Sequence, residues 1–293
     1  MLIVQELTLD QISLFKPFAY PNFRSKLHEL VESPNHVVLR AMIFNQPAGL
    51  LIAYRNGPES DCEVESIFVA ARFRNIGVAT GLFQTLIGNS QASAQIQIRY
   101  FNNLSEKAYL EQALHKAGFD RPQMHSIYYN SELAALAHAP WIRRCKLSPE
   151  FQILPWKHIT EQQRKDLEEK RYFDYPLGLS PFIHEEVIQA SASLVLQRQD
   201  GAIMGWIIYH SYVENAVLCR SLFIAESLQD KGIGISIMGL SIVRMLEINL
   251  TSAVFQVTST NKRMLRIADK MFMPYQTEQT EYRQALFIRK QLL

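Results

Sequence analysis

The strongest constraint on the fold is a strand–loop–helix pattern that occurs twice in the sequence. The apolar run Val64–Val69 precedes a loop at residues 74–79 and a segment that favours a helix over residues 76–87. The same order returns later in the chain, where the loop occupies residues 229–234. A strand–loop–helix pattern that recurs after about the length of one domain predicts two copies of the same domain.

The second copy has the same parts in the same register. The apolar run Val217–Ile224 precedes the loop, and a helix is expected to continue from it to about Leu246. Gly232 follows Gly77 by 155 residues, about half of the 293-residue chain. Glycine lets a backbone approach a ligand closely, and the first N–H groups of a helix lack partners within the helix. Each loop is therefore suited to bind an anion such as a pyrophosphate.

The two loops, Arg74-Asn75-Ile76-Gly77-Val78-Ala79 and Gln229-Asp230-Lys231-Gly232-Ile233-Gly234, share a pattern. Arg/Gln-x-x-Gly-x-Gly/Ala between a strand and a helix resembles motif A of the GNAT superfamily of acyl-CoA-dependent N-acyltransferases. Two copies at this spacing make the chain similar to tandem GNAT proteins. The resemblance implies an α/β chain of the α+β type, with two tandem domains. Each would be a mixed, mostly antiparallel twisted sheet flanked by helices.

The resemblance also implies which residues contact the cofactor, which would be acetyl-CoA or another acyl-CoA. They are the strand ends, the loops and one Asn after the following strand of each unit. In the first unit these are Phe68, Val69, Arg74, Ile76, Gly77, Val78, Ala79 and Asn103. In the second they are Phe223, Ile224, Gln229, Lys231, Gly232, Ile233, Gly234 and Asn261. Either loop could instead be a simple turn, and Asn103 could simply cap a helix.

Candidate catalytic residues occur on the first motif strand. Glu63 and Glu65 lie two residues apart, which in a regular strand puts them on one face. A carboxylate there could act as the general base that takes a proton from an amine. The alternative is that both are solvent-facing strand residues. The matching positions of the second unit are Leu218 and Arg220, neither of which is a carboxylate.

The tyrosine that many GNAT members use as general acid is missing. Its position falls on Leu114 in the first unit and on Ala268 in the second. Tyr109, Tyr128 and Tyr275 could substitute, or could be packing residues. Because of this departure from the family pattern, the sequence supports cofactor binding more strongly than catalytic turnover.

Composition narrows the function classes. The chain has 30 basic and 28 acidic residues and 48% hydrophobic residues, so we expect globular domains and neither nucleic acid nor a membrane as partner. The three cysteines form no CxxC pair, which is typical of free thiols in the cytoplasm. The eight histidines show no metal-ligand spacing, so no metal is expected. The composition indicates no oligomeric state.

The expected domains are residues 1–140 and 141–293, with the boundary between residues 131 and 150. We expect residues 125–129 to close the first sheet and residues 282–288 to close the second. Hairpins are expected with turns at Asn45–Pro47 and Asp200–Gly201.

Two functions remain open at this stage. The first is an acyl-CoA-dependent N-acyltransferase that acts by direct transfer on a small amine or amino-acid-like acceptor. The alternative is a catalytically degenerate acyl-CoA-binding or interaction protein. The second loop, with both glycines and Asn261, favours CoA binding in the second unit, whereas Glu63 and Glu65 favour chemistry in the first.

Overall fold

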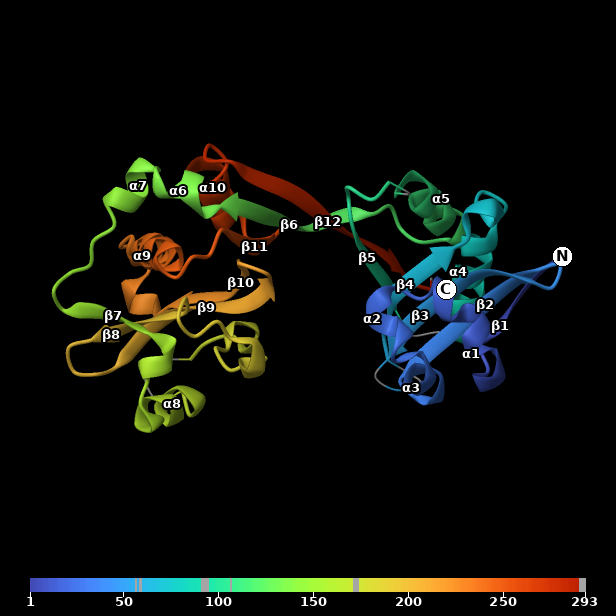
Figure 1. Ribbon diagram of the computed structural model, residues 1–293, viewed down its shortest axis with the longest axis horizontal. Helices are drawn as coiled ribbons and strands as arrows, with labels where there is room; N and C mark the ends of the chain where they lie inside the picture. Colours follow the sequence, from blue (N-terminus) through green and yellow to red (C-terminus); the bar gives the residue numbers. More distant parts are fainter. Residues whose placement is uncertain (56, 58–59, 91–94, 106, 171–173, 290–293) are drawn as a thin grey trace. The chain divides into compact units, whose positions relative to one another are not determined.

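The computed structural model describes residues 1–289 apart from 56, 58–59, 91–94, 106 and 171–173. It divides into two compact units, residues 1–125 with 281 onward, and residues 126–280 (Figure 1). This division follows the contacts between residues. That residues 1–140 and 141–293 fold as two separate domains stays a prediction.

The first unit is a mixed sheet with the strand order β1-β2-β3-β4-β5-β12. Neighbouring strands are antiparallel except β4 and β5, which are parallel. The strands are β1 (Leu2–Glu6), β2 (His36–Ile43), β3 (Gln46–Arg55), β4 (Cys62–Val69), β5 (Ile96–Phe101) and β12 (Thr277–Phe287). The helices are α1 (Ile12–Phe15), α2 (Pro21–Arg24), α3 (Leu27–Glu32), α4 (Val78–Asn89) and α5 (Lys107–Ala117).

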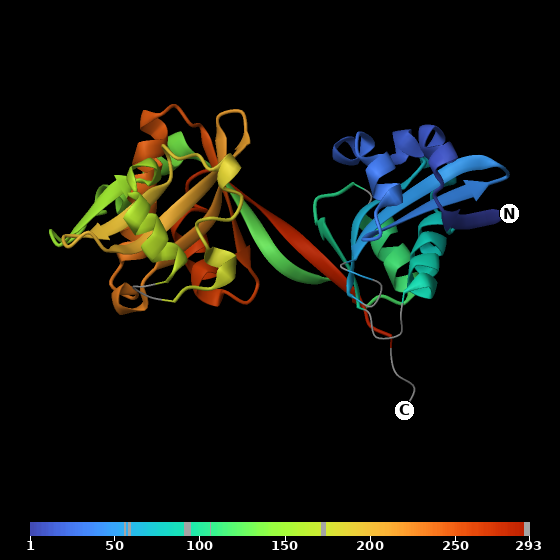
Figure 2. The same cartoon turned by 90° about the horizontal axis from the view of Figure 1, so that it is seen from below.

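Strand alternation sends the apolar residues of this sheet to two separate cores. On β2, Leu39 and its alternate neighbours pack against α4 and α5. Val38, between them, packs on the other face with Phe15 of α1 and Leu27 of α3. The sheet is therefore covered on both faces (Figures 1 and 2), by α4 and α5 on one and by α1–α3 on the other.

The second unit repeats this plan with the strand order β6-β11-β10-β9-β8-β7. Its strands are β6 (Gln123–Glu132), β7 (Phe151–Pro155), β8 (Leu194–Arg198), β9 (Ile203–Val213), β10 (Ala216–Ile224) and β11 (Ser252–Thr258). Its helices are α6 (Leu133–Ala137), α7 (Pro140–Arg143), α8 (Glu161–Glu168), α9 (Ile233–Glu247) and α10 (Lys262–Met271). The face of α9 carries a mainly aliphatic core, whereas half of the buried residues in the core on the face of α8 are aromatic.

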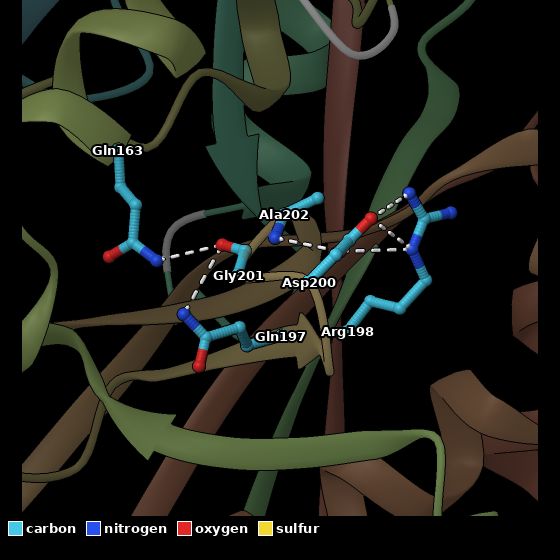
Figure 3. A network of polar contacts seen from close by, with 6 residues as sticks. All are labelled: Gln163, Gln197, Arg198, Asp200, Gly201 and Ala202. Carbon is cyan, nitrogen blue, oxygen red and sulfur yellow. Dashed lines mark hydrogen bonds and ion pairs between the residues drawn. The ribbon is translucent and has the colours of Figure 1, made fainter.

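Both predicted hairpins are confirmed. The β2–β3 turn is made by Phe44 and Asn45, with Gln46 and Pro47 of the predicted turn already in β3, and the β8–β9 turn contains Asp200 and Gly201 (Figure 3). Gly201 has a φ of 89°, and its carbonyl accepts from Gln163 Nε2 at 2.8 Å and from Gln197 Nε2 at 3.2 Å. Asp200 accepts from the Ala202 amide at 3.1 Å and pairs with Arg198. The turn is thereby tied to α8, which begins with a capping box at Thr160 and Gln163.

The prediction of which strand closes each sheet is wrong. β6 pairs antiparallel with β11, so residues 126–132 complete the second unit. β12 pairs antiparallel with β5, so residues 282–287 complete the first unit. Both strands have similar apolar alternation, and that local signal does not say which sheet edge each one joins.

No helix formed by the described residues is long and apolar enough to cross a membrane.

Candidate functional site

Each unit presents its loop in the same unusual backbone conformation. Gly77 has a φ of 91° and precedes α4, and Gly232 has a φ of 77° and precedes α9. Asn75 and Asp230, two residues earlier, also have positive φ values, of 65° and 63°. A β-carbon at either glycine would meet nothing within 4 Å. Glycine is therefore required there by the left-handed backbone, and the space above it is open.

The first residue of each loop is tied to the strand before it. Arg74 Nε donates to the Val69 carbonyl at 3.2 Å, and Gln229 Nε2 donates to the Ile224 carbonyl at 3.0 Å. This bond explains why an arginine and a glutamine occupy equivalent positions, since both offer a side-chain N–H donor. It also fixes the loop relative to the strand end.

The strand before each loop contains a bulge and then separates from its parallel neighbour. Opposite β3, Val64 faces Ala53 and Ser66 faces Ile52, so Glu65 is the extra residue. In the second unit Arg220 is the extra residue, between Cys219 and Ser221. Parallel pairing of β4 with β5 covers only Cys62–Val64 and ends before the bulge. Such a bulge redirects a side chain and ends strand pairing, as happens next to many active sites.

In the first unit a cavity of about 570 Å³ lies at this separation. It is lined by the loop, by both strands, by α5 and by side chains from the opposite face of the sheet. The loop and α5 contribute Arg74, Asn75, Gly77, Val78, Ala79, Thr80, Tyr109, Leu110, Gln112, Ala113 and Lys116. The opposite face contributes Tyr20, Glu65, Phe68, Arg99, Phe101 and Tyr282. The cavity therefore joins the glycine loop to Glu65.

Glu65 has a defined electrostatic environment at this cavity. Its Oε2 lies 3.7 Å from His36 Nε2, and His36 Nδ1 lies 3.0 Å from Ser33 Oγ. Burial raises the pKa of Glu65, His36 acts to lower it, and Glu63 acts to raise it. A carboxylate with a raised pKa that faces a cavity is suited to accept a proton near neutral pH.

Glu63 occupies a different position. Its carboxylate lies 3.3 Å from Arg99 Nη1 and accepts from Gln97 Nε2 at 3.3 Å. Glu63 is not among the cavity-lining residues, whereas Arg99 is. Glu63 and Glu65 lie on the same face of the sheet, as predicted, because Cys62 and Val64 face the opposite core, but Glu63 is held by Arg99 and Gln97 whereas Glu65 lines the cavity.

Some of the other residues predicted to contact the cofactor line the cavity, and others do not. Phe68, Val69, Arg74, Gly77, Val78 and Ala79 line the cavity. Ile76 points outward with 60% exposure, and Asn103 is exposed in the turn before α5. Asn261 caps α10, because its Oδ1 accepts from the Met264 amide at 3.0 Å. A cap satisfies the helix end whether or not a ligand is bound.

In the second unit, a residue equivalent to one that lines the first cavity is packed in an aromatic core. Phe223, the equivalent of Phe68, is 8% exposed and stacks on Trp206 with ring centroids 4.8 Å apart. Tyr175 packs edge-on against the same tryptophan at 5.0 Å. Arg220 Nη1, at the bulge, donates to the Gly178 carbonyl at 3.1 Å.

The second loop also differs in charge. Asp230 forms an ion pair with Arg263 of α10. In the first unit the equivalent of Asp230 is the neutral Asn75, beside the cationic Arg74. The predicted site residues Phe223, Ile224, Gln229, Lys231, Gly232, Ile233 and Gly234 thus have the loop geometry in common with the first unit, but not its cavity lining or its charge.

Sequence reasoning missed several residues that line the first cavity. Tyr20, Arg99 and Tyr282 have no motif signal, and Tyr282 comes from the last strand of the chain. Tyr109, named as a substitute acid, does line the cavity, whereas Leu114 at the usual acid position is fully buried. Among the described residues, no group of His, Cys, Asp and Glu side chains is arranged to hold a metal ion.

Comparison with solved structures identifies the fold. The chain is similar to a GCN5-related glucosamine N-acetyltransferase region of a fungal multi-domain GH3 β-N-acetylglucosaminidase, with a TM-score of 0.68 and 14% identity. That match covers 98% of this chain and 38% of the other, so this chain spans well under half of that protein. A GCN5-related N-acetyltransferase from Sphaerobacter thermophilus matches with a TM-score of 0.60 and 13% identity over 100% of this chain and 97% of that one.

A tandem GNAT protein from the clavulanic acid biosynthesis pathway also matches, with a TM-score of 0.60 and 10% identity over 99% of both chains. No protein-family model matches the chain. The comparison with curated proteins finds no match either. The resemblance indicated by the two loops is thus confirmed for the fold, which is a tandem GNAT fold over nearly the whole chain.

Proposed function

We propose that the protein is an acyl-CoA-dependent N-acyltransferase, that acetyl-CoA is its donor, and that its first unit holds both donor and acceptor. One observation carries this proposal. A single cavity joins the left-handed glycine loop to a carboxylate on the opposite side of the sheet. Donor and acceptor could therefore meet in the gap between β4 and β5.

The residues present fit a CoA group. The cavity of about 570 Å³ is of the size that binds a large cofactor. The open space above Gly77 lies at the start of α4, where unpaired amides and the helix dipole favour a pyrophosphate. Arg74 and Lys116 line the same cavity and add positive charge. When bound, acyl-CoA supplies a thioester, so the net reaction forms an N–C bond to the acceptor, breaks the C–S bond and releases CoA as the thiol.

Glu65 is assigned the role of general base. The acceptor nitrogen loses a proton on acylation, and the Glu65 carboxylate accepts it directly or through one water. His36, 3.7 Å behind Glu65, favours the ionised form of that carboxylate and so keeps it able to accept. Tyr109 lines the cavity and carries a hydroxyl that could donate a proton to the departing sulfur.

The second unit is assigned a structural role. Phe223, at the position of the cavity-lining Phe68, is stacked on Trp206, and Arg220, which cannot accept a proton, replaces Glu65. The ion pair between Asp230 and Arg263 also places a carboxylate at the loop that would receive a phosphate.

The test is acetyl-CoA turnover with a panel of primary amines, followed by release of free thiol. The parent protein is expected to release thiol only when an amine is present. Glu65→Gln, which keeps the shape but cannot act as base, is expected to bind acetyl-CoA with parent affinity and to lose about 10²–10⁴ in kcat. Binding of acetyl-CoA without turnover on any amine would favour the alternative, an acyl-CoA-binding protein without catalysis. No binding at all would refute the proposal.

A further inference from the structure

The end of the cavity that lies away from the glycine loop is lined mainly by aromatic side chains. Along β5, Ile98 and Tyr100 belong to the core under α4 and α5, so the alternate residues Arg99 and Phe101 face the other side of the sheet. Tyr282 lies opposite Phe101 across the β12–β5 pairing. The lining residues on this face are Tyr20, Glu65, Phe68, Arg99, Phe101 and Tyr282. Four of these six are aromatic.

The rings come from separate elements. Phe101 and Tyr282 contact each other with centroids 4.8 Å apart. Phe68 is held edge-on against Phe18 at 5.7 Å, and Tyr20, the N-cap residue before α2, has 47% of its surface exposed. Rings that line a cavity provide apolar surface for a ligand body and negatively charged faces for a cation.

The charged side chains at this end of the cavity, Arg99 and Glu65, differ in how they are paired. Arg99 is already engaged, because Nη1 lies 3.3 Å from Glu63 and Nη2 donates to Gln97 Oε1 at 3.1 Å. Within the described part of the chain, the ion-pair contact of Glu65 is with His36 Nε2 at 3.7 Å, longer than the 3.3 Å contact between Arg99 and Glu63. A ligand at this end therefore meets a carboxylate and aromatic rings, while the guanidinium is neutralised by Glu63.

From this arrangement we infer the acceptor class, an inference that rests on the proposed function. The acceptor is a primary amine carried on an aromatic or other apolar body, without a carboxylate beside the nitrogen. The ammonium approaches Glu65, which also takes its proton, and the body lies among Tyr20, Phe68 and Tyr282. An α-carboxylate would approach Glu65 and find Arg99 already paired, so amino acids are excluded by charge.

The test compares two acceptors that differ only by a carboxylate, 2-phenylethylamine and L-phenylalanine, with acetyl-CoA as donor. We expect kcat/KM to be at least tenfold higher for 2-phenylethylamine, and higher for it than for spermidine, which has no apolar body of that size. Equal or better use of L-phenylalanine or spermidine would overturn the acceptor class while leaving the acyltransferase assignment intact.

Two variants sharpen the test. Glu63→Gln frees Arg99, so the ratio of the two kcat/KM values is expected to shift at least threefold towards L-phenylalanine. Tyr282→Leu is expected to weaken the binding of 2-phenylethylamine to the CoA-saturated protein about tenfold, measured by calorimetry. That measurement needs no turnover, so it tests the acceptor class even if acyl transfer fails. Parent affinity in Tyr282→Leu, or no binding to the parent, would refute the inference.

Discussion

Replacing Gly77 and, separately, Gly232 by alanine is expected to show which loop binds acyl-CoA. Both glycines precede a helix with positive φ, 91° and 77°, and neither would place a β-carbon within 4 Å of another atom. The cost to stability is therefore backbone strain alone, about 1–2 kcal/mol at each site. Thermal unfolding should report a similar loss for both, about 2–4 °C in Tm for each kcal/mol.

The effect on binding should differ. In Gly77→Ala the added methyl enters the open space above the loop of the cavity. Losing one amide hydrogen bond to a charged phosphate costs about 1.5–3 kcal/mol, which is about 10- to 100-fold in Kd for CoA. Gly232→Ala carries the same strain at a loop whose Asp230 is paired with Arg263, and it should bind CoA with parent affinity.

Titration calorimetry with CoA on the two variants and the parent is the assay. Equal weakening in both variants would refute the reasoning, since strain would then account for the effect. Parent affinity in Gly77→Ala together with the expected drop in Tm would refute it as well. Weakening only in Gly232→Ala would instead support the interpretation of the sequence that favours CoA binding in the second unit.

Three further perturbations test other parts of the structure. His36→Gln should move the acid limb of the pH profile of kcat/KM to higher pH, because His36 lowers the pKa of Glu65; an unmoved limb would exclude Glu65 as the base. Phe223→Ala should cost about 3–5 kcal/mol in urea unfolding, because its ring is 8% exposed and stacked on Trp206, whereas Phe68→Ala beside the cavity should cost less; equal losses would contradict the contrast between the units. Thr160→Ala removes the capping box of α8 and should cost about 1 kcal/mol without changing CoA affinity, and a coupled loss of affinity would contradict a purely structural second unit.

The parts of the site that are local in sequence could be predicted. The two loops, their positions between a strand and a helix, and the need for Gly77 and Gly232 depend on a few consecutive residues. At the second glycine position of the motif, the structure requires a glycine less strictly than the sequence pattern indicates. A β-carbon at Gly234 would lie 3.7 Å from Ile224 Cγ1, an ordinary contact, so Ala79 at the equivalent position does not weaken the first loop.

The parts that depend on distant residues could not be predicted. Tyr20 and Tyr282 meet at one cavity only because β12 pairs with β5, and the strand pattern does not encode that choice of partner. The engagement of Glu63 by Arg99 depends on the neighbouring strand β5, and the bulge at Glu65 changes the backbone without a residue type that announces it. The apolar alternation that predicts the strand is the same with or without the bulge.

The bulge also gives a physical basis for assigning different roles to two similar units. Both units place one extra residue at the equivalent position, Glu65 in β4 and Arg220 in β10, so the backbone geometry is common to both. The side chain differs in its chemistry. Glu65 can accept a proton and faces a cavity, whereas Arg220 stays protonated and donates to the Gly178 carbonyl. If the bulge serves to direct a reactive group into the gap between strands, only the first unit has a group there that can act as a base.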